Sequence, residues 1–121
     1  MSSKRVLIFE DELLVAKMYT LILEKNDFET KVVSVVNDIE NVILNFSPDV
    51  IVMDNQLKNK ESGFEASLMI REKGINIPIV FTTGNSETLA KEFITKVNNS
   101  NYMIKPIDAF DLLNAINLII K

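Results

Sequence analysis

The sequence of 121 residues contains no cysteine, no histidine and no tryptophan. The missing cysteines exclude disulfide bonds and thiol chemistry, and the missing histidines exclude imidazole catalysis and the usual transition-metal sites. Glycine and proline are scarce, with 3 of each, and no linker, repeat or low-complexity segment is visible. No apolar run is long enough for a signal peptide or a membrane span. We therefore expect a soluble cytoplasmic protein with one domain over residues 1–121.

The charge balance argues against polyanionic partners. The chain has 13 Lys and Arg residues against 17 Asp and Glu residues, which gives a formal net charge of −4. Nucleic acids and anionic membranes are bound through basic surfaces, so we expect neither of them as the main partner.

Short apolar runs alternate with longer amphipathic stretches along the chain. Three runs, Val6–Phe9, Val50–Met53 and Ile79–Phe81, show no alternation of polar and apolar residues, which indicates strands buried on both faces, as in a parallel sheet. With two further runs, the predicted strands are Val6–Phe9, Thr30–Val36, Val50–Met53, Ile79–Thr82 and Tyr102–Ile104.

Helical periodicity fills the stretches between these strands. Residues 13–25 form the first predicted helix, whose expected apolar face consists of Leu14, Met18, Leu21 and Ile22, with Tyr19 beside them. The further predicted helices are residues 38–46, residues 63–73 before Gly74, a helix capped by Ser86, and a last helix that follows its N-cap Asp108 and runs to Lys121. Strands that alternate with helices in this order form a doubly wound (βα)5 fold of the α/β class, with a five-stranded parallel sheet and helices on both faces.

Polar side chains follow the predicted strands at the points where they end. They are Glu10, Asp11 and Glu12 after the first strand, Asp54 after the third, Thr82 and Thr83 at the end of the fourth, and Lys105 after the fifth. Ligands of such folds bind beyond the carboxyl ends of the strands. Carboxylates that meet there repel one another, so either one is protonated or a cation is bound. Oxygen ligands without histidine or cysteine select a hard cation, for which Mg²⁺ fits better than Ca²⁺.

These groups suit the transfer of a phosphoryl group to a carboxylate. Asp54 stands alone after the central strand and is the best candidate nucleophile, while Glu10 and Asp11 are better suited to hold the metal. The metal and an ammonium would neutralise the oxygens of the transferring group, and a threonine hydroxyl would bind one of them. Each group alone has a structural explanation: a helix N-cap, a strand threonine with a satisfied hydroxyl, or a Lys-Pro turn. Their joint placement at strand ends favours the functional interpretation.

Over essentially its whole length, the sequence resembles the receiver domain of two-component response regulators, typified by the single-domain chemotaxis regulator. The matching motifs are the acidic pair Glu10-Asp11, Asp54 after Ile51-Val52-Met53, Thr83-Gly84, Tyr102, and Lys105-Pro106. The resemblance implies a flavodoxin-like receiver fold. It also implies a signalling phosphoprotein, part of a phosphorelay, that takes a phosphoryl group from phosphohistidine onto Asp54.

The resemblance also implies a metal-ligand set. Asp11 and Asp54 would bind Mg²⁺ or Mn²⁺ directly, the Gln56 carbonyl oxygen would be a third ligand, and Glu10 would act mainly through water. Lys105 would contact the phosphoryl oxygens, and the Lys105-Pro106 bond would be cis.

A switch and a docking surface follow from the same resemblance. In the family, a threonine hydroxyl captures the phosphoryl group and an aromatic ring moves inward, which remodels a surface formed by the fourth helix, the fifth strand and the fifth helix. Thr83 and Tyr102 match these two positions. Gln56 and Asn85 flank the phosphoryl group and would tune its lifetime, so we expect alanine at either position to change the rate of its loss.

The last predicted helix carries apolar residues on more than one side. Its core stripe consists of Ala109, Leu112, Leu113, Ile116 and Ile120. Phe110 and Leu118 point away from this stripe, and scattered exposed apolar residues are normal in soluble proteins. Because the position of Phe110 is often polar in the family, we favour a partner or homodimer surface there.

The chain lacks histidine and cannot be its own phosphodonor. The implied partners are a histidine kinase or a histidine phosphotransfer protein, and an unknown output protein or domain. The protein is not expected to be an enzyme in the ordinary sense, because it would catalyse only its own phosphorylation and autodephosphorylation. It is either a stand-alone regulator, which Met1 favours, or a receiver from a longer hybrid kinase.

Other functions compete with this interpretation. Lys58 stands where the family has a proline, and Asn59 and Ser62 replace a Gly and an Asp of a variant loop, so a pseudo-receiver that docks proteins without phosphorylation stays open. A flavin or nucleotide binder needs a phosphate-binding loop after the first strand, where this chain has three acidic residues. An aspartyl-phosphate phosphatase needs an acid at the position of Gln56.

Overall fold

The computed structural model describes residues 3–57, 62–84 and 86–120. Within these residues, strands and helices alternate along the chain. The strands are β1 (Lys4–Phe9), β2 (Phe28–Val33), β3 (Val50–Asp54), β4 (Ile79–Thr83) and β5 (Ser100–Ile104), and the helices are α1 (Leu13–Lys25), α2 (Ile39–Phe46), α3 (Gly63–Glu72), α4 (Glu87–Lys96) and α5 (Ala109–Ile119).

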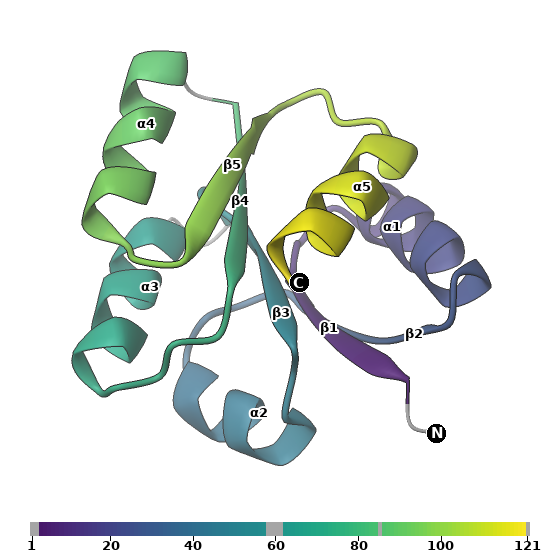
Figure 1. Cartoon of the computed structure of the whole chain (residues 1–121), viewed down its shortest axis with the longest axis horizontal. Coiled ribbons are helices and arrows are strands. Elements are labelled where there is room, and N and C mark those ends of the chain that lie inside the picture. Colours follow the sequence, from purple (N-terminus) through teal and green to yellow (C-terminus); the bar gives the residue numbers. More distant parts are fainter. Residues whose placement is uncertain (1–2, 58–61, 85, 121) are drawn as a thin grey trace.

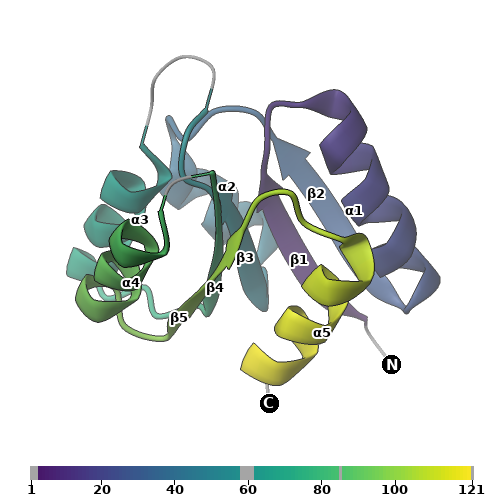
Figure 2. The same ribbon diagram turned by 90° about the horizontal axis from the view of Figure 1, so that it is seen from above.

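The strands form one parallel sheet in the order β2-β1-β3-β4-β5. Helices α1 and α5 cover one face of this sheet, and α2, α3 and α4 cover the other (Figures 1 and 2). The doubly wound α/β fold expected from the sequence is therefore confirmed. The strand order reverses between β1 and β3, and this is the place where open α/β sheets bind their ligands.

The inner strands of the sheet are buried on both faces, and each strand sends alternate side chains to opposite faces. In β3, Ile51 and Met53 join the core beneath α2, α3 and α4, whereas Val50 and Val52 join the core beneath α1 and α5. The unbroken apolar runs of the sequence follow from this arrangement, since a strand covered on both sides has no position for a polar side chain.

The orientation of α1 differs from the sequence-based expectation. Leu14 is 79% exposed, and Met18 and Leu21 are exposed as well, so three of the four residues of the predicted apolar stripe face outward. The buried face is made instead by Ala16, Tyr19 and Leu23, with Val15 and Ile22 packed beside them. Helix α1 is apolar around most of its circumference, so spacings of three and four residues fit two stripes equally well. The stripe that contains the aromatic ring fills the core.

The predicted boundaries of the elements hold to within a few residues. The main deviation is β2, which pairs with β1 from Phe28 to Val33 and not from Thr30 to Val36. The predicted caps are confirmed: the side chains of Ser86 and Asp108 accept hydrogen bonds from backbone N–H groups in the first turns of α4 and α5. Gly74, just past α3, adopts a φ of +83° that favours glycine.

Arg71 joins two loops at the end of the sheet that lies opposite the strands' carboxyl ends. Its guanidinium donates hydrogen bonds to the carbonyl oxygens of Ile75 and Ile77, which precede β4. It also donates to the carbonyl oxygens of Asn98 and Asn99, which precede β5. Burial lowers the pKa of Arg71 from its usual value, and these acceptors stabilise its charge.

Candidate functional site

The carboxyl ends of β1 and β3 bring three acidic side chains together. Glu10, Asp11 and Asp54 each offer a carboxylate oxygen, and these oxygens lie within 4.8 Å of one another. Glu10 and Asp54 are almost completely buried, with 1% and 3% of their surfaces exposed. The pairing of the two strands explains why these side chains lie close together. Phe9 of β1 pairs with Met53 of β3, and the residues that follow them, Glu10 and Asp54, are both acidic.

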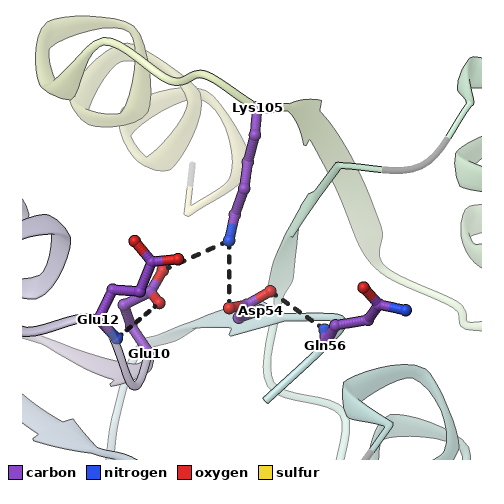
Figure 3. Close-up of polar contacts among 5 residues, drawn as sticks. All are labelled: Glu10, Glu12, Asp54, Gln56 and Lys105. Carbon is purple, nitrogen blue, oxygen red and sulfur yellow. Dashed lines mark hydrogen bonds and ion pairs between the residues drawn. The ribbon is translucent and has the colours of Figure 1, made fainter. Parts of the chain in front are cut away.

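Lys105 places its ammonium group between the buried carboxylates (Figure 3). Its Nζ atom donates a hydrogen bond to Oδ2 of Asp54 at 3.2 Å and lies 3.8 Å from Oε1 of Glu10. Its backbone N–H donates to the carbonyl oxygen of Thr83 at 2.8 Å, which continues the β4–β5 ladder past the end of β5. The Lys105-Pro106 peptide bond is cis, as expected from the resemblance.

Burial and charge shift the titration of this cluster. Burial raises the pKa of Glu10, and the neighbouring Asp54 carboxylate raises it further, against the opposing effects of the Glu12 backbone N–H and of Lys105. Burial alone would lower the pKa of Lys105, but the carboxylates of Asp54 and Glu10 outweigh burial and raise it. Lys105 therefore stays protonated at neutral pH.

The cluster fits a divalent cation. Oε2 of Glu10 accepts a hydrogen bond from the backbone N–H of Glu12 at 3.1 Å, but its buried Oε1 accepts none from the described residues. A buried oxygen of this kind, within reach of two more carboxylates, is a ligand of the type that hard cations select. The donor set contains only oxygen and therefore suits Mg²⁺.

Backbone contacts hold the loop that follows Asp54. The backbone N–H of Gln56 donates to Oδ1 of Asp54 at 3.1 Å. The side chain of Gln56 points away from Asp54 (Figure 3). The expectation that the Gln56 carbonyl oxygen binds the metal stays a prediction. The Asn85 site and the loop positions Lys58 and Asn59 lie outside the described residues.

Sequence reasoning missed the role of Asn55, which connects three elements. Its backbone N–H donates to the carbonyl oxygen of Thr82, and its carbonyl oxygen accepts from Gly63. Its side-chain Oδ1 accepts from the backbone N–H of Phe64. Asn55 thus fixes the end of β3 to β4 and to the first turn of α3, which keeps Asp54 in place. In the sequence, only the position of Asn55 directly after Asp54 indicated this role.

Gly63 is required where α3 touches the end of β3. A Cβ atom at this position would meet the Asp54 carbonyl oxygen and lie 2.6 Å from Cγ of Met53. The helix therefore begins in direct contact with the backbone of Asp54.

The remaining predicted residues lie on β4, β5 and α5. Thr83 ends β4 and is buried. Tyr102 on β5 is half-buried, and its hydroxyl donates a hydrogen bond to Oε1 of Glu87 in the first turn of α4 at 3.0 Å. Phe110 and Leu118 on α5 are 64% and 71% exposed, so both point away from the core, as the helical pattern indicated.

Comparison with known proteins identifies the family. The model of the response regulator receiver domain matches residues 6–117. The chain belongs to this family. Accepting a phosphoryl group is the general role of receiver domains, and the acidic cluster stands where receiver domains bind Mg²⁺.

Curated relatives of this receiver domain are regulators. It is 30% identical over 114 residues to the transcriptional regulatory protein DltR of Streptococcus agalactiae. The aligned region covers 94% of this chain and 50% of the relative. It is 26% identical over 115 residues to the photosynthetic apparatus regulatory protein RegA of Rhodobacter capsulatus, which covers 95% of this chain and 62% of the relative. The chain thus spans about half the length of the curated relatives it matches.

Solved receiver domains share the fold. The receiver domain of the Francisella response regulator 1452 superposes with a TM-score of 0.87 at 22% identity, over 97% of this chain and 96% of that one. The signal receiver domain of a modulated diguanylate cyclase from Desulfovibrio desulfuricans superposes with a TM-score of 0.81 at 26% identity, over 98% of this chain and 94% of that one. Among the described residues of the present chain, none of the helices is both long enough and apolar enough to cross a membrane.

Proposed function

We propose that Asp54 accepts a phosphoryl group from the phosphohistidine of a histidine kinase or a histidine phosphotransfer protein. The contact between Lys105 and Asp54 inside the acidic cluster is the main support for this proposal. It unites a carboxylate nucleophile, a positive charge and a set of cation ligands in one place, which is the equipment that phosphoryl transfer requires.

The proposed reaction is a displacement at phosphorus. An oxygen of the Asp54 carboxylate attacks the phosphorus atom, an O–P bond forms, and the P–N bond of phosphohistidine breaks. The imidazole leaves with the electron pair of that bond and takes up a proton from water. The Lys105 ammonium and the Thr83 hydroxyl stabilise the oxygens of the transferring group. Glu10, Asp11, Asp54 and the Gln56 carbonyl oxygen would hold a Mg²⁺ or Mn²⁺ ion, which supplies further positive charge when bound.

The acyl phosphate is then lost by hydrolysis, which the protein itself catalyses. Water attacks the phosphorus atom, the bond between phosphorus and the Asp54 oxygen breaks, inorganic phosphate leaves with the protons of the water, and the Asp54 carboxylate is regenerated. Gln56 stands two residues after Asp54 and its side chain is exposed to solvent, from which the attacking water comes. We therefore assign the tuning of the phosphoryl lifetime to Gln56, together with Asn85.

The proposed output surface is formed by α4, β5 and α5. Tyr102 is held to α4 by Glu87, and release of this bond would let the ring move as Thr83 binds the phosphoryl group. The exposed Phe110 supplies an apolar contact on α5 for an output protein, an output domain or a second copy of the chain. Leu118 would extend that contact along α5.

Phosphorylation by a small donor tests the proposal. Wild type and Asp54→Asn are each incubated with acetyl phosphate and Mg²⁺, and the intact mass is measured. We expect a mass increase of one phosphoryl group in the wild type, none in the variant, and none in the wild type when EDTA replaces Mg²⁺. Equal behaviour of the two proteins would overturn the proposal in favour of a docking module that needs no phosphorylation.

A further inference from the structure

Thr82 belongs to a row of side chains that crosses the sheet beside the site. The register pairs Asp54 of β3 with Thr82 of β4, and Thr82 with Met103 of β5. Residues paired in this way point to the same face of a parallel sheet. Val80, two residues before Thr82, packs in the core beneath α1 and α5, so the side chain of Thr82 lies on that same face.

The hydroxyl of Thr82 is buried without a partner. The residue is 1% exposed, and its Oγ1 atom forms no hydrogen bond with the described part of the chain. Asp54 and Met103 lie beside Thr82 on this face, and the positions two residues earlier on β3 and β4, Val52 and Val80, are filled by valine, which has nearly the same shape as threonine. Packing alone therefore gives no reason for a hydroxyl, because buried polar atoms are normally hydrogen-bonded.

The side chain of Lys105 crosses the end of β4, the strand that carries Thr82. Lys105 follows the end of β5, and its Nζ atom reaches Asp54 on β3, so the side chain crosses the end of β4, which lies between these strands. An ammonium group has three N–H donors. One is bonded to Asp54, and Glu10 attracts the group from 3.8 Å, which leaves donor capacity on the side where β4 ends.

We propose that Thr82 is a positioning residue whose hydroxyl accepts a hydrogen bond from the Lys105 ammonium and holds it beside Asp54. As Asp54 changes from a carboxylate to an acyl phosphate, its own attraction for the ammonium weakens. A neutral acceptor from β4 keeps the charge at the phosphoryl group through this change. The effect on phosphorylation rests on the function proposed above, whereas the contact with Lys105 does not.

Two pairs of variants isolate the hydroxyl. Comparison of Thr82→Val with wild type shows the effect of losing the hydroxyl at nearly constant shape. Comparison of Thr82→Ala with Thr82→Ser shows the same effect at a smaller side-chain size, and this second pair is used if valine disturbs folding. Thr30→Val is the matched control, because Thr30 pairs with Val6 and thus lies on the same face of the sheet, two strands away from β3. The first readout is the hydrogen-exchange rate of the Lys105 ammonium, followed by ¹⁵N NMR and assigned with Lys105→Arg. The second is the rate of phosphorylation by acetyl phosphate with Mg²⁺.

We expect each loss of the hydroxyl to accelerate ammonium exchange and to slow phosphorylation by about three- to tenfold, the effect of one hydrogen bond. Thr82→Ser and Thr30→Val should match wild type in both readouts. Unchanged ammonium exchange overturns the inference, whatever happens to phosphorylation. If the exchange changes but the wild type is not phosphorylated, the contact is confirmed and the proposed function fails instead.

Discussion

Nζ of Lys105 lies 3.2 Å from Oδ2 of Asp54, although 51 positions of the sequence separate the two residues. The contact crosses β4, since β3 and β5 flank that strand in the sheet. It places a positive charge against the candidate nucleophile before any phosphoryl group arrives. The contact therefore joins the two groups inside a site in which Asp54 is almost completely buried.

Removing this ammonium should destabilise the protein. Lys105→Met keeps most of the stem but leaves the buried carboxylates of Asp54 and Glu10 without a cation. We expect the metal-free variant to lose about 1–3 kcal/mol, because a buried acceptor loses its charged donor. Urea denaturation in EDTA measures the loss. The matched control is Lys91→Met, which breaks an exposed ion pair with Glu87 and should cost less than about 1 kcal/mol. Equal losses in both variants would contradict the assigned role of Lys105.

Mg²⁺ should stabilise the folded protein through the acidic cluster. A ligand at 100 times its dissociation constant contributes about 2.7 kcal/mol when it binds only the folded state. We expect Mg²⁺ to raise the melting temperature of the wild type, with most of this rise lost in Asp11→Asn. Glu29→Gln, on β2 away from the cluster, serves as the control and should respond like the wild type. A full response in Asp11→Asn would place the metal elsewhere.

Glu10 should make the metal-free protein sensitive to pH. Its pKa is raised in the folded state by burial and by Asp54, so the folded protein binds the proton of Glu10 more tightly than the unfolded chain does. This tighter proton binding adds to the free energy of unfolding. The contribution is fully present below the pKa of Glu10 in the unfolded chain and is lost as the pH rises through its pKa in the folded protein. Glu10→Gln does not show this loss, because glutamine does not ionise. We expect the variant to gain stability relative to wild type at neutral pH in EDTA, and the gain to vanish near pH 4, below the usual Glu pKa of about 4.3. If the gain in stability of Glu10→Gln did not depend on pH, its cause would be packing and not the protonation of Glu10.

Gly63→Ala should disturb the backbone of Asp54. The added methyl group would overlap Cγ of Met53 and the Asp54 carbonyl oxygen, and overpacking of this kind costs about 1–3 kcal/mol. We expect a lower melting temperature together with slower phosphorylation. Gly84→Ala is the stability control, because a Cβ atom there has no neighbour within 4 Å. A melting temperature as low in Gly84→Ala as in Gly63→Ala would contradict this explanation.

Glu87 should restrain the ring of Tyr102. The hydrogen bond between them ties β5 to the first turn of α4. Glu87→Ala removes the acceptor, and we expect faster flipping of the Tyr102 ring and altered amide signals of α4 in NMR spectra. Stability should change by less than about 1 kcal/mol, because the pair is exposed. Glu92→Ala, in the same helix, should leave the Tyr102 signals unchanged. Unaltered ring flipping in Glu87→Ala would remove Glu87 from the switch.

The sequence predicts the fold and the meeting of the acidic residues with Lys105 for one physical reason. Runs such as Val50–Met53 are apolar on both faces, which indicates parallel strands, and parallel strands present their carboxyl ends at one edge. Asp54 follows such a run and Lys105 follows another predicted strand of the same sheet, so the topology alone brings them to the same edge. The direct contact between them also depends on the conformation of the lysine side chain.

Other features depend on packing that periodicity does not encode. Helix α1 has two apolar stripes, and only the fit of Tyr19 against the sheet decides which one is buried. The unpartnered hydroxyl of Thr82 became visible only with the register of β3 and β4. The bond between Tyr102 and Glu87 joins residues on separate elements, so no local pattern announces it.

The guanidinium of Arg71 restrains one end of the proposed output surface, which is formed by α4, β5 and α5. Because it grips the backbone both before β4 and before β5, the carboxyl-terminal end of α4 is anchored to α3. The amino-terminal end of α4 is held near Tyr102 by the side chain of Glu87. If α4 is displaced when the output surface proposed above is remodelled, we therefore expect its carboxyl-terminal end, next to the loop that Arg71 holds, to stay in place and its amino-terminal end to move.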